Sequence, residues 1–371
     1  MTKIVDSYLC KVCNSSQVYS LNIPKLPISA QPFGDLPSCN FSIETSLFLC
    51  QECGHMFLDI IPVPYYKNVI RSVSVSSEMT RYRRDQFSSI ISSLSKPASQ
   101  IRVLEIGAGN GQYSQILSEF FPECFATEPN TKNTINFGVQ FIDTHPDDTD
   151  FEDVMKPFGY FDLICCFSYL EHLPNPHRTL TQIERLLASD GVALIEVPNF
   201  DYIRKKGLLC EVIPDHLHYF TAKSLVSLAS SAQLNLQRAN SIWSNYILSC
   251  IFQKQEDCQM VLSRLLSCHE MLLAQIQAEV QPLSLDQKIA VWGAGHQSLF
   301  ILASSILAER VDFIYDSSHA KQDKFIPGIN VKVSNPRSLL TDNVSLLFVI
   351  CAGYNEEVVL SIKRKKLAGC L

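Results

Sequence analysis

The chain has 371 residues, of which 46% are hydrophobic and 18% are charged, and its formal net charge at pH 7 is −6. This length exceeds one ordinary hydrophobic core and predicts two or three domains. The composition is that of a soluble globular protein, and the negative charge argues against nucleic-acid binding, which needs a local excess of Lys and Arg. No stretch reaches the roughly 18 consecutive apolar residues of a membrane span. The N-terminus has no apolar signal region, so we expect a cytoplasmic protein.

Two cysteine pairs near the N-terminus have the spacing of a metal site. Cys10 and Cys13 form one pair, and Cys50 and Cys53 form the other. Each pair can present two thiolates to one tetrahedral ion. A zinc ribbon with a long loop between the pairs accounts for both, and four ordinary buried thiols are the alternative. Because four thiolates close the coordination sphere, we expect a structural Zn²⁺ that supports folding and not a catalytic one.

A glycine-rich turn, Gly107-Ala108-Gly109-Asn110-Gly111, follows an apolar strand that ends at Glu105 and Ile106. Glycine lets the backbone approach a ligand closely, and the helix expected at 113–121 offers free N–H groups at its start. A dinucleotide fingerprint would place its third glycine at the next position, which is Gln112. The spacing is instead similar to the turn that holds S-adenosylmethionine (SAM) in class I methyltransferases, which implies SAM contacts for Glu105, Gly107, Gly109 and Gly111.

Two acidic residues end the strands that come next. Glu128 ends an apolar strand roughly 20 residues after the first glycine, where a carboxylate accepts both ribose hydroxyls of a nucleotide. Asp143 ends the following strand, and we expect it near the adenine edge. The strands and helices alternate, which predicts a mostly parallel sheet. Further strands are expected at 161–167 and 192–197, with a helix at 180–187 whose end is marked by Asp190-Gly191.

The stretch after the last of these strands carries the groups most suited to proton transfer. Asp215 precedes His216, and His218 and Tyr219 follow closely. Imidazoles exchange protons near neutral pH, and side chains two residues apart on an extended segment point the same way. We predict that His216 is a catalytic base supported by Asp215, His218 and Tyr219. The alternative is a pair of packed or solvent-facing histidines.

The C-terminal part begins with a helical pattern over 241–284, which we interpret as a helix that packs between domains. Strands are then expected at 288–292, 311–315 and 346–351, and the first leads into Gly293-Ala294-Gly295. Ser298 stands at the third glycine position, so the dinucleotide fingerprint is incomplete. We favour a Rossmann-like domain in which His296 and Gln297, at a helix start, contact an anionic acceptor such as a nucleotide diphosphate. A second dinucleotide site that takes NAD is the alternative.

The order of ribbon, SAM domain and second Rossmann-like domain resembles the nucleotide-sugar C-methyltransferases, class I SAM-dependent enzymes of deoxysugar pathways. The resemblance covers nearly the whole chain and implies methylation at C3 of a dTDP-4-keto-6-deoxysugar. It also implies that the base is the last histidine of a Tyr-His-Glu-His run followed by Leu-x-Tyr-Phe. His216 and the Leu217-His218-Tyr219-Phe220 run match, whereas Asp215 replaces the glutamate. Ser72 and Ser74 stand where the family has paired tyrosines.

The sequence therefore predicts an α/β protein with a SAM domain at its centre and a second, smaller Rossmann-like domain. The predicted segments are a zinc ribbon at 1–60, a connection at 61–98, a SAM-dependent methyltransferase domain at 99–240, a helical linker at 241–284 and a Rossmann-like domain at 285–371. We expect C-methylation of a nucleotide-linked keto-deoxysugar through an enolate, by a monomer or small homo-oligomer. An O- or N-methyltransferase of a small metabolite and a non-catalytic SAM- or nucleotide-binding module are the alternatives.

Overall fold

The computed structural model describes residues 3–4, 8–27, 42–63, 66–68, 75–92, 94, 96–129 and 138–364. The chain separates into two compact units: unit 1 is Met1–Gln255 and unit 2 is Glu256–Leu371. Ser72 and Ser74, which replace the paired tyrosines of the family, lie outside the described residues. None of the helices in the described ranges is long and apolar enough to cross a membrane.

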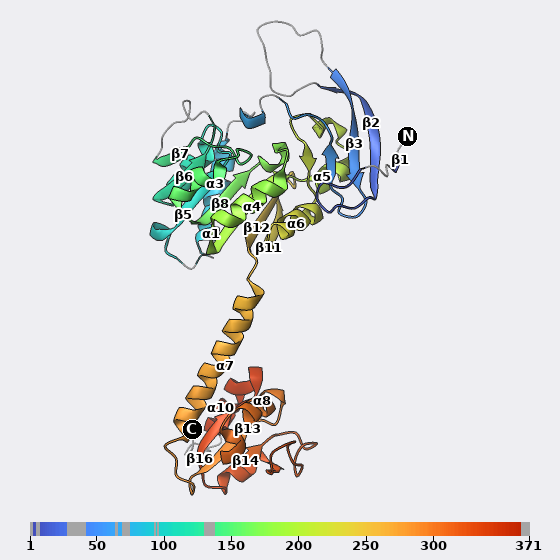
Figure 1. Ribbon diagram of the computed structural model, residues 1–371. Helices are drawn as coiled ribbons and strands as arrows, with labels where there is room; N and C mark the ends of the chain where they lie inside the picture. The colour runs from blue at the N-terminus through green and yellow to red at the C-terminus, as the bar shows by residue number, and fades with distance from the viewer. Residues whose placement is uncertain are drawn as a thin grey trace. The chain divides into compact units, whose positions relative to one another are not determined.

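The centre of unit 1 is a seven-stranded sheet with the order β11-β12-β9-β8-β5-β6-β7 (Figure 1). Its five parallel strands are β5 (Arg102–Ile106), β6 (Glu123–Thr127), β7 (Val139–Ile142), β8 (Phe161–Phe167) and β9 (Leu187–Pro198). The two antiparallel strands are β11 (Leu234–Ile242) and β12 (Ile247–Lys254). In this order, β6 and β7 lie on one side of β5, and β8 and β9 lie on the other. Parallel sheets bind ligands at the carboxyl ends of the strands where the order reverses in this way, which is here at β5.

Helices cover both faces of this sheet because its strands are apolar on both sides. Val103 and Leu104 are neighbours on β5, yet they belong to cores on opposite faces. Phe87 of α1 packs into the core that contains Val103, and Leu180 of α4 packs into the core that contains Leu104. The helices of unit 1 are α1 (Ser77–Ile91), α2 (Gln112–Ser118), α3 (Phe151–Met155), α4 (Pro176–Leu186), α5 (Phe200–Lys206) and α6 (Ala222–Ser231).

A second sheet of unit 1 joins the cysteine-rich segment to the SAM-type domain. Its order is β1-β2-β3-β4-β10, with β1 (Lys3–Ile4), β2 (Val18–Pro27), β3 (Ser42–Cys50), β4 (Met56–Leu58) and β10 (His218–Tyr219). The predicted long loop is shorter than expected, because β2 and β3 extend into it as a hairpin paired from Val18↔Cys50 to Pro27↔Ser42. The last strand comes from a segment far away in the sequence, with His218 opposite Phe57. The ribbon therefore shares a sheet with the segment that follows His216.

Unit 2 is built on a four-stranded parallel sheet with the order β15-β14-β13-β16. The strands are β13 (Lys288–Trp292), β14 (Val311–Tyr315), β15 (Val333–Ser334) and β16 (Val344–Val349). The helices are α7 (Cys258–Val280), α8 (His296–Ser304), α9 (Leu307–Arg310) and α10 (Asn355–Arg364). Ile276 and Val280 of α7 pack into the core of this unit.

The structure corrects three predicted elements. Residues 247–254 form strand β12 and not part of a helix; Leu248, Cys250 and Phe252 alternate as buried residues, which is the period of a strand. Asp190 and Gly191 lie within β9, so they do not mark the end of the preceding helix.

The third correction concerns the helix expected over 241–284, which was interpreted as packing between domains. Met260, Leu262 and Leu265 of α7 are exposed. Only the C-terminal part of α7 is buried in unit 2, at Ile276 and Val280.

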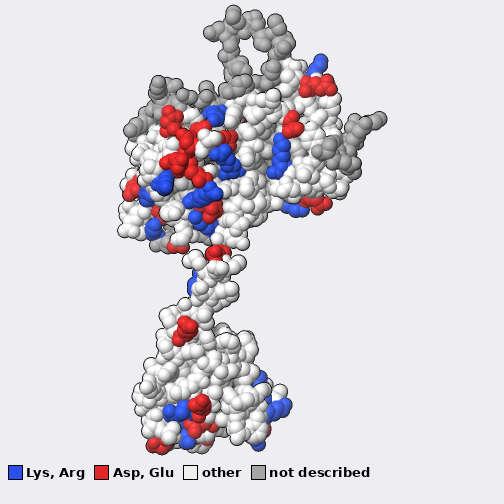
Figure 2. All heavy atoms as spheres, in the orientation of Figure 1, with Lys and Arg blue, Asp and Glu red and all other residues white. Residues whose placement is uncertain are grey.

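Charged side chains are distributed without a wide basic patch on the face of the described residues in Figure 2, where acidic and basic groups are interspersed. Many of them pair with each other, as Arg84 does with Glu119 and Arg102 with Glu123. Exposed pairs of this kind contribute little to stability.

Candidate functional site

The glycine turn after β5 is shaped by close packing on two sides. Gly107, Gly109 and Gly111 all have positive φ angles, of 72°, 58° and 79°. A Cβ on Gly107 would lie 2.4 Å from the ring of Tyr169, and one on Gly111 would lie 2.8 Å from the ring of Phe141. Beside Gly109, by contrast, no heavy atom of the described residues lies within 4 Å of the added Cβ position. The turn thus offers open space at its centre, where a ligand can approach the backbone.

Two of the predicted carboxylates border this turn. Glu105 is buried at the end of β5 and accepts a hydrogen bond from the Ser114 hydroxyl of α2. Glu128 follows β6, and its Oε2 accepts a hydrogen bond of 2.8 Å from the Gly109 N–H. Burial raises the pKa of Glu128 to about 7. Asp143 follows β7 at the same edge of the sheet and is exposed.

This arrangement fits the nucleoside part of SAM. A nucleoside ligand needs space beside the glycine turn and a carboxylate that accepts from ribose hydroxyls. The open position at Gly109 supplies the space, and the Glu128 carboxylate lies directly next to it. The Tyr169 hydroxyl is buried and has no hydrogen-bond partner among the described residues. Gly109 and Glu128 are therefore compatible with a bound nucleoside.

A second cluster at the same edge contains His216. This residue lies in the loop between the short 3-10 helix Leu209–Glu211 and β10, and its ring meets the ring of His172 edge-on with 4.6 Å between centroids. His172 and Glu171 belong to the 3-10 helix Leu170–His172 that follows β8. One ligand atom from each of these three side chains lies within 4.8 Å of the others. Neither carboxylate oxygen of Glu171 has a hydrogen-bond partner in the described part of the chain.

Burial keeps this cluster uncharged near neutral pH. Burial, together with the neighbouring His172, holds the pKa of His216 well below its ordinary value. Burial lowers the pKa of His172 to about 4 and raises the pKa of Glu171 to about 8. At pH 7 both imidazoles are therefore neutral and can accept a proton, whereas most Glu171 side chains hold one. Such a cluster is suited to proton transfer at a water-poor site.

Main-chain contacts position the loop that carries His216. Nδ1 of His172 lies 2.6 Å from the carbonyl oxygen of Asp215. Because a carbonyl only accepts, we assign the hydrogen of His172 to Nδ1, which leaves its Nε2 as an acceptor. The Tyr219 hydroxyl accepts a hydrogen bond of 2.8 Å from Ile213 N–H. His172 and Tyr219 thus fix this loop from its two sides.

His218 lies apart from His216, so the expectation that the two side chains point the same way is wrong. The reason is that β10 begins only at His218, and His216 precedes it in a loop. The His218 ring is buried toward the ribbon, where its Nδ1 lies 3.1 Å from Nε2 of His55. The Tyr219 hydroxyl bonds to the main chain of Ile213, which gives this residue a positioning contact in the structure.

Sequence reasoning did not assign roles to Glu171, Tyr169 or His55. Glu171 and Tyr169 follow β8 and are brought to the site by the sheet, as expected at the carboxyl end of a parallel strand. The sequence contains a signal for Glu171, because this acid and the neighbouring His172 follow shortly after the apolar strand 161–167, where parallel strands bring ligand-binding residues together. No comparable local signal exists for His55, whose partner His218 is remote in sequence.

The four cysteines of the ribbon come together as predicted. Sγ of Cys10 lies 3.6 Å from Sγ of Cys53, and Cys13 and Cys50 are separated by the same distance. All four sulfur atoms lie within 4.8 Å of one another. A tetrahedral Zn²⁺ with bonds of about 2.3 Å needs sulfur atoms about 3.8 Å apart. The cluster is therefore compatible with zinc.

Unit 2 has a pocket of 410 Å³ beside its own glycine turn, and His296 and Gln297 line it. A Cβ on Gly293 would lie 2.2 Å from the carbonyl oxygen of Ile350, so the glycine is needed for close packing. The hydroxyl of Ser298 donates to that same carbonyl at 2.9 Å, which explains a serine in place of the third glycine. The pocket also contains Asp316, which accepts from Ala294 N–H and from the Lys321 ammonium.

Two family models match the chain, one in each unit. Residues 79–239 match a methyltransferase domain, and residues 269–369 match a C-methyltransferase C-terminal domain. The chain is also similar to the C-methyltransferase NovU of Streptomyces niveus, with 21% identity over 284 residues that cover 69% of this chain and 68% of the relative.

Solved structures that are similar to part of this chain include two proteins. One is the PH0226 protein from Pyrococcus horikoshii OT3, with 16% identity, a TM-score of 0.39, and coverage of 52% of this chain and 99% of that one. Another is the CcbJ methyltransferase from Streptomyces caelestis, with 12% identity, a TM-score of 0.38, and coverage of 48% and 96%. These scores are low, so the site is interpreted from its own geometry.

Proposed function

Because the chain belongs to the class I SAM-dependent methyltransferases, we propose that it methylates a carbon atom of a nucleotide-linked keto-deoxysugar. The observation that carries this proposal is the uncharged cluster of His216, His172 and Glu171 at the carboxyl edge of the sheet that holds the SAM turn. The C-methyltransferase C-terminal domain matched by unit 2 and the relative NovU support carbon as the acceptor atom.

The proposed reaction starts with removal of a proton next to the ketone of the sugar. SAM supplies an electrophilic methyl group when it is bound. His216 takes the proton from the carbon, and the C–H electron pair moves to form an enolate. The enolate carbon then attacks the methyl group while the methyl–sulfur bond breaks, and its electron pair leaves with the sulfur as S-adenosylhomocysteine. Asp215 supports His216 through the loop they share. Glu171 is a nearby acid that holds a proton at neutral pH, so it can stabilise negative charge on the enolate oxygen.

The remaining predicted residues divide between the two ligands. On the SAM side, we propose that Glu128 accepts from the ribose and that Asp143 lies near the adenine edge, beside the backbone of the glycine turn. In unit 2, His296 and Gln297 start helix α8, and we propose that they bind an anionic group such as a nucleotide diphosphate. The ribbon would hold a structural Zn²⁺ through Cys10, Cys13, Cys50 and Cys53.

The acceptor is identified by incubating the protein with SAM and a panel of nucleotide-linked 4-keto-6-deoxysugars. We expect a new C-methyl group on the carbon next to the ketone, located by NMR. A methyl group on oxygen or nitrogen would replace the C-methylation proposal with the corresponding alternative. Calorimetric binding of SAM without transfer to any member of the panel would favour a non-catalytic binding module. Reactions without protein serve as the control.

SAM binding should depend on the ionisation of Glu128. Because burial raises the pKa of this carboxyl to about 7, it is largely protonated below pH 6 and ionised above pH 8. Only the ionised form accepts from both ribose hydroxyls, so the affinity for SAM should increase as the pH rises through about 7. Calorimetric titrations between pH 6 and 8.5 measure this change.

A Glu128→Gln variant provides the comparison for this pH dependence. It should bind SAM more weakly at pH 8 and show little change in affinity over the same range. Asp153→Asn is the control, because Asp153 is an exposed acid of α3 in the same unit and has no part in the proposed SAM site. An unchanged pH dependence in Glu128→Gln would show that another group titrates.

A further inference from the structure

The cluster of Glu171, His172 and His216 also has the composition of a metal site. Among the described residues, three or more possible metal ligands converge in two places, which are the four cysteines of the ribbon and this cluster. Two imidazoles and one carboxylate form a common type of site for divalent transition-metal ions. One ligand atom from each side chain lies within 4.8 Å of the others. Zinc bonds of about 2.0–2.2 Å separate ligand atoms by about 3.4 Å, so small rotations of these side chains would bring them onto one ion.

Glu171 is the residue that indicates a ligand at this place. Its side chain is only 1% exposed, and neither of its carboxylate oxygens has a hydrogen-bond partner among the described residues. A buried polar group without a partner costs free energy, because it has lost its contacts with water. An ion bound to these oxygens would remove that cost. His216 is partly exposed, so the cluster is accessible from its side.

Two bonds hold His216 against the pair formed by Glu171 and His172. Before His216, the carbonyl oxygen of Asp215 lies 2.6 Å from Nδ1 of His172. After His216, the Leu217 N–H donates to the carbonyl of Glu171 at 2.8 Å. The first of these bonds is also typical of metal-binding histidines, in which one ring nitrogen donates to a carbonyl and the other binds the ion. Nε2 of His172 is therefore available for an ion.

The charges around the cluster suit a single divalent cation. Both imidazoles are neutral at pH 7, and Glu171 would release its proton when it binds a metal. A divalent ion and the Glu171 carboxylate together carry one positive charge. The Asp215 carboxylate is buried nearby, and its charge acts on His172 in the direction that favours positive charge. Asp215 would therefore offset the positive charge that remains.

We propose that Glu171, His172 and His216 bind one divalent ion such as Zn²⁺, Co²⁺ or Ni²⁺, and that this ion inhibits methyl transfer; the inhibition, but not the binding, rests on the proposed function. A ring nitrogen that gives its lone pair to a metal cannot accept a proton, so His216 cannot act as the base while the ion is bound. Imidazole ligands favour these ions over Mg²⁺ and Ca²⁺, which prefer oxygen. Because thiolates are softer ligands, the ribbon would take Zn²⁺ before this cluster.

Cobalt is a suitable probe, because the absorption of Co²⁺ depends on its ligands. Protein whose ribbon is loaded with Zn²⁺ is titrated with Co²⁺ in the absence of substrates. We expect saturable visible absorption without the near-ultraviolet band that thiolate ligands produce, and an unchanged zinc content. Methyl transfer should decrease in proportion to cobalt occupancy. The absence of visible absorption would overturn the site, and a thiolate band would instead place the cobalt in the ribbon.

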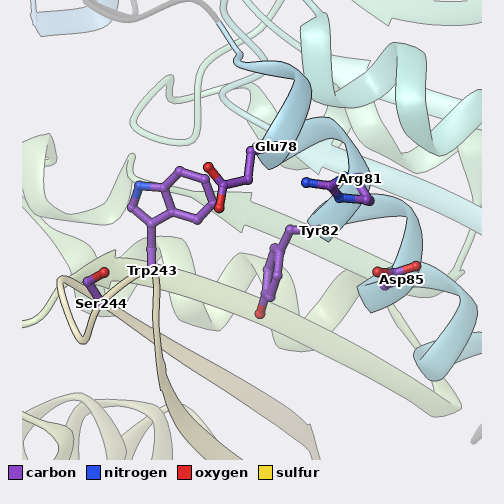
Figure 3. Close-up of a pocket in the computed structure, with 6 residues that line it drawn as sticks. All are labelled: Glu78, Arg81, Tyr82, Asp85, Trp243 and Ser244. Carbon is purple, nitrogen blue, oxygen red and sulfur yellow. The ribbon is translucent and has the colours of Figure 1, made fainter.

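Variants of the ligands test whether the cobalt is bound by this cluster. Glu171→Gln and His216→Asn should each weaken Co²⁺ binding by more than about 100-fold, since the loss of even an outer partner of a metal ligand costs roughly 10- to 100-fold. Glu78→Gln is the matched control. Glu78 is an exposed acid of α1 that lines a separate groove with Tyr82 and Trp243 (Figure 3), so this variant should bind Co²⁺ and transfer methyl groups normally. Calorimetric SAM titration verifies that each variant is folded. Unchanged cobalt binding in both ligand variants would overturn the site.

The metal site and the proposed function fail by different results. Methyl transfer to a nucleotide-linked keto-sugar without any cobalt binding would refute the site and leave the function standing. Cobalt binding that depends on Glu171 and His216, without transfer to any sugar, would support the site and refute the function. A rate that increases with cobalt occupancy would overturn the inhibition and would show that His216 is not the base.

Discussion

Replacing His216 by Asn should lower the rate of methyl transfer by roughly 10²- to 10⁴-fold, the usual contribution of a general base. Asparagine keeps a planar polar side chain in the loop, but it cannot take a proton near neutral pH. SAM affinity should stay close to that of the unmodified protein, because the glycine turn and Glu128 do not contact this loop through any bond described above. Initial rates with labelled SAM and calorimetric SAM titration measure the two effects separately.

His177→Asn is the matched control, because His177 is an exposed histidine of α4 in the same unit. The pH profile adds a second readout. Burial holds the pKa of His216 well below 6.5, so this base stays neutral and active as the pH falls through 6.5. The plot of methyl-transfer rate against pH for the unmodified protein should therefore show no inflection from His216 near pH 6.5. Full turnover by His216→Asn would remove this residue from the proposed mechanism.

Elements with continuous apolar runs were predictable with correct bounds. Strands 161–167, 288–292 and 311–315 were expected at the residues where β8, β13 and β14 lie. Each is mostly apolar, as buried parallel strands are, and its one charged residue (Asp162, Lys288 or Asp312) lies at the first or second position of the strand. By contrast, β12 was not predicted. It follows a hairpin turn at Trp243 and is close in the sequence to α7, so its residues were included in the helical pattern of that helix.

The residues on the SAM side of the site could be predicted from their local spacing in the sequence. Those on the acceptor side could not. Gly109 of the turn after β5 meets Glu128 after β6, because these neighbouring parallel strands end at one edge of the sheet. The separation of His216 from His218 depends instead on the pairing of β10 with β4, which lies far away in the sequence. Long-range strand pairing leaves no periodic signal in a two-residue strand. The contact between His55 and His218 was unpredictable for the same reason.

The pairing of β10 with β4 makes the ribbon a structural support for the loop that carries His216, which we call the acceptor loop. Leu58 N–H donates to the Leu217 carbonyl at 3.0 Å, directly next to His216. The Thr221 hydroxyl donates at 2.9 Å to the carbonyl of Cys53, one of the four clustered cysteines. The core of the ribbon at Phe57 is continuous with that of the SAM-type domain. Movement of the cysteine cluster would therefore displace the segments on both sides of β10.

Removal of the proposed Zn²⁺, or a Cys50→Ser substitution, should consequently abolish methyl transfer. Structural zinc contributes about 10–16 kcal/mol in small zinc domains, which is comparable to the whole stability of a typical protein, about 5–15 kcal/mol. The ribbon should unfold without the metal and release β10 and His216. SAM binding should persist, though weakened, because the glycine turn follows β5 in the centre of the other sheet. Metal content, SAM calorimetry and transfer rates before and after chelation measure these effects.

Cys258→Ser is the control for the cysteine substitution, because Cys258 is exposed and lies in unit 2. It should retain both zinc and activity. The order of the losses is the informative result: if the ribbon acts through β10, activity should disappear at the chelator concentration that removes zinc, before SAM binding declines. Metal-free protein that still transfers methyl groups at the full rate would show that the acceptor loop does not depend on the ribbon. Loss of SAM binding together with activity would instead indicate that the shared core at Phe57 makes the two sheets unfold as one.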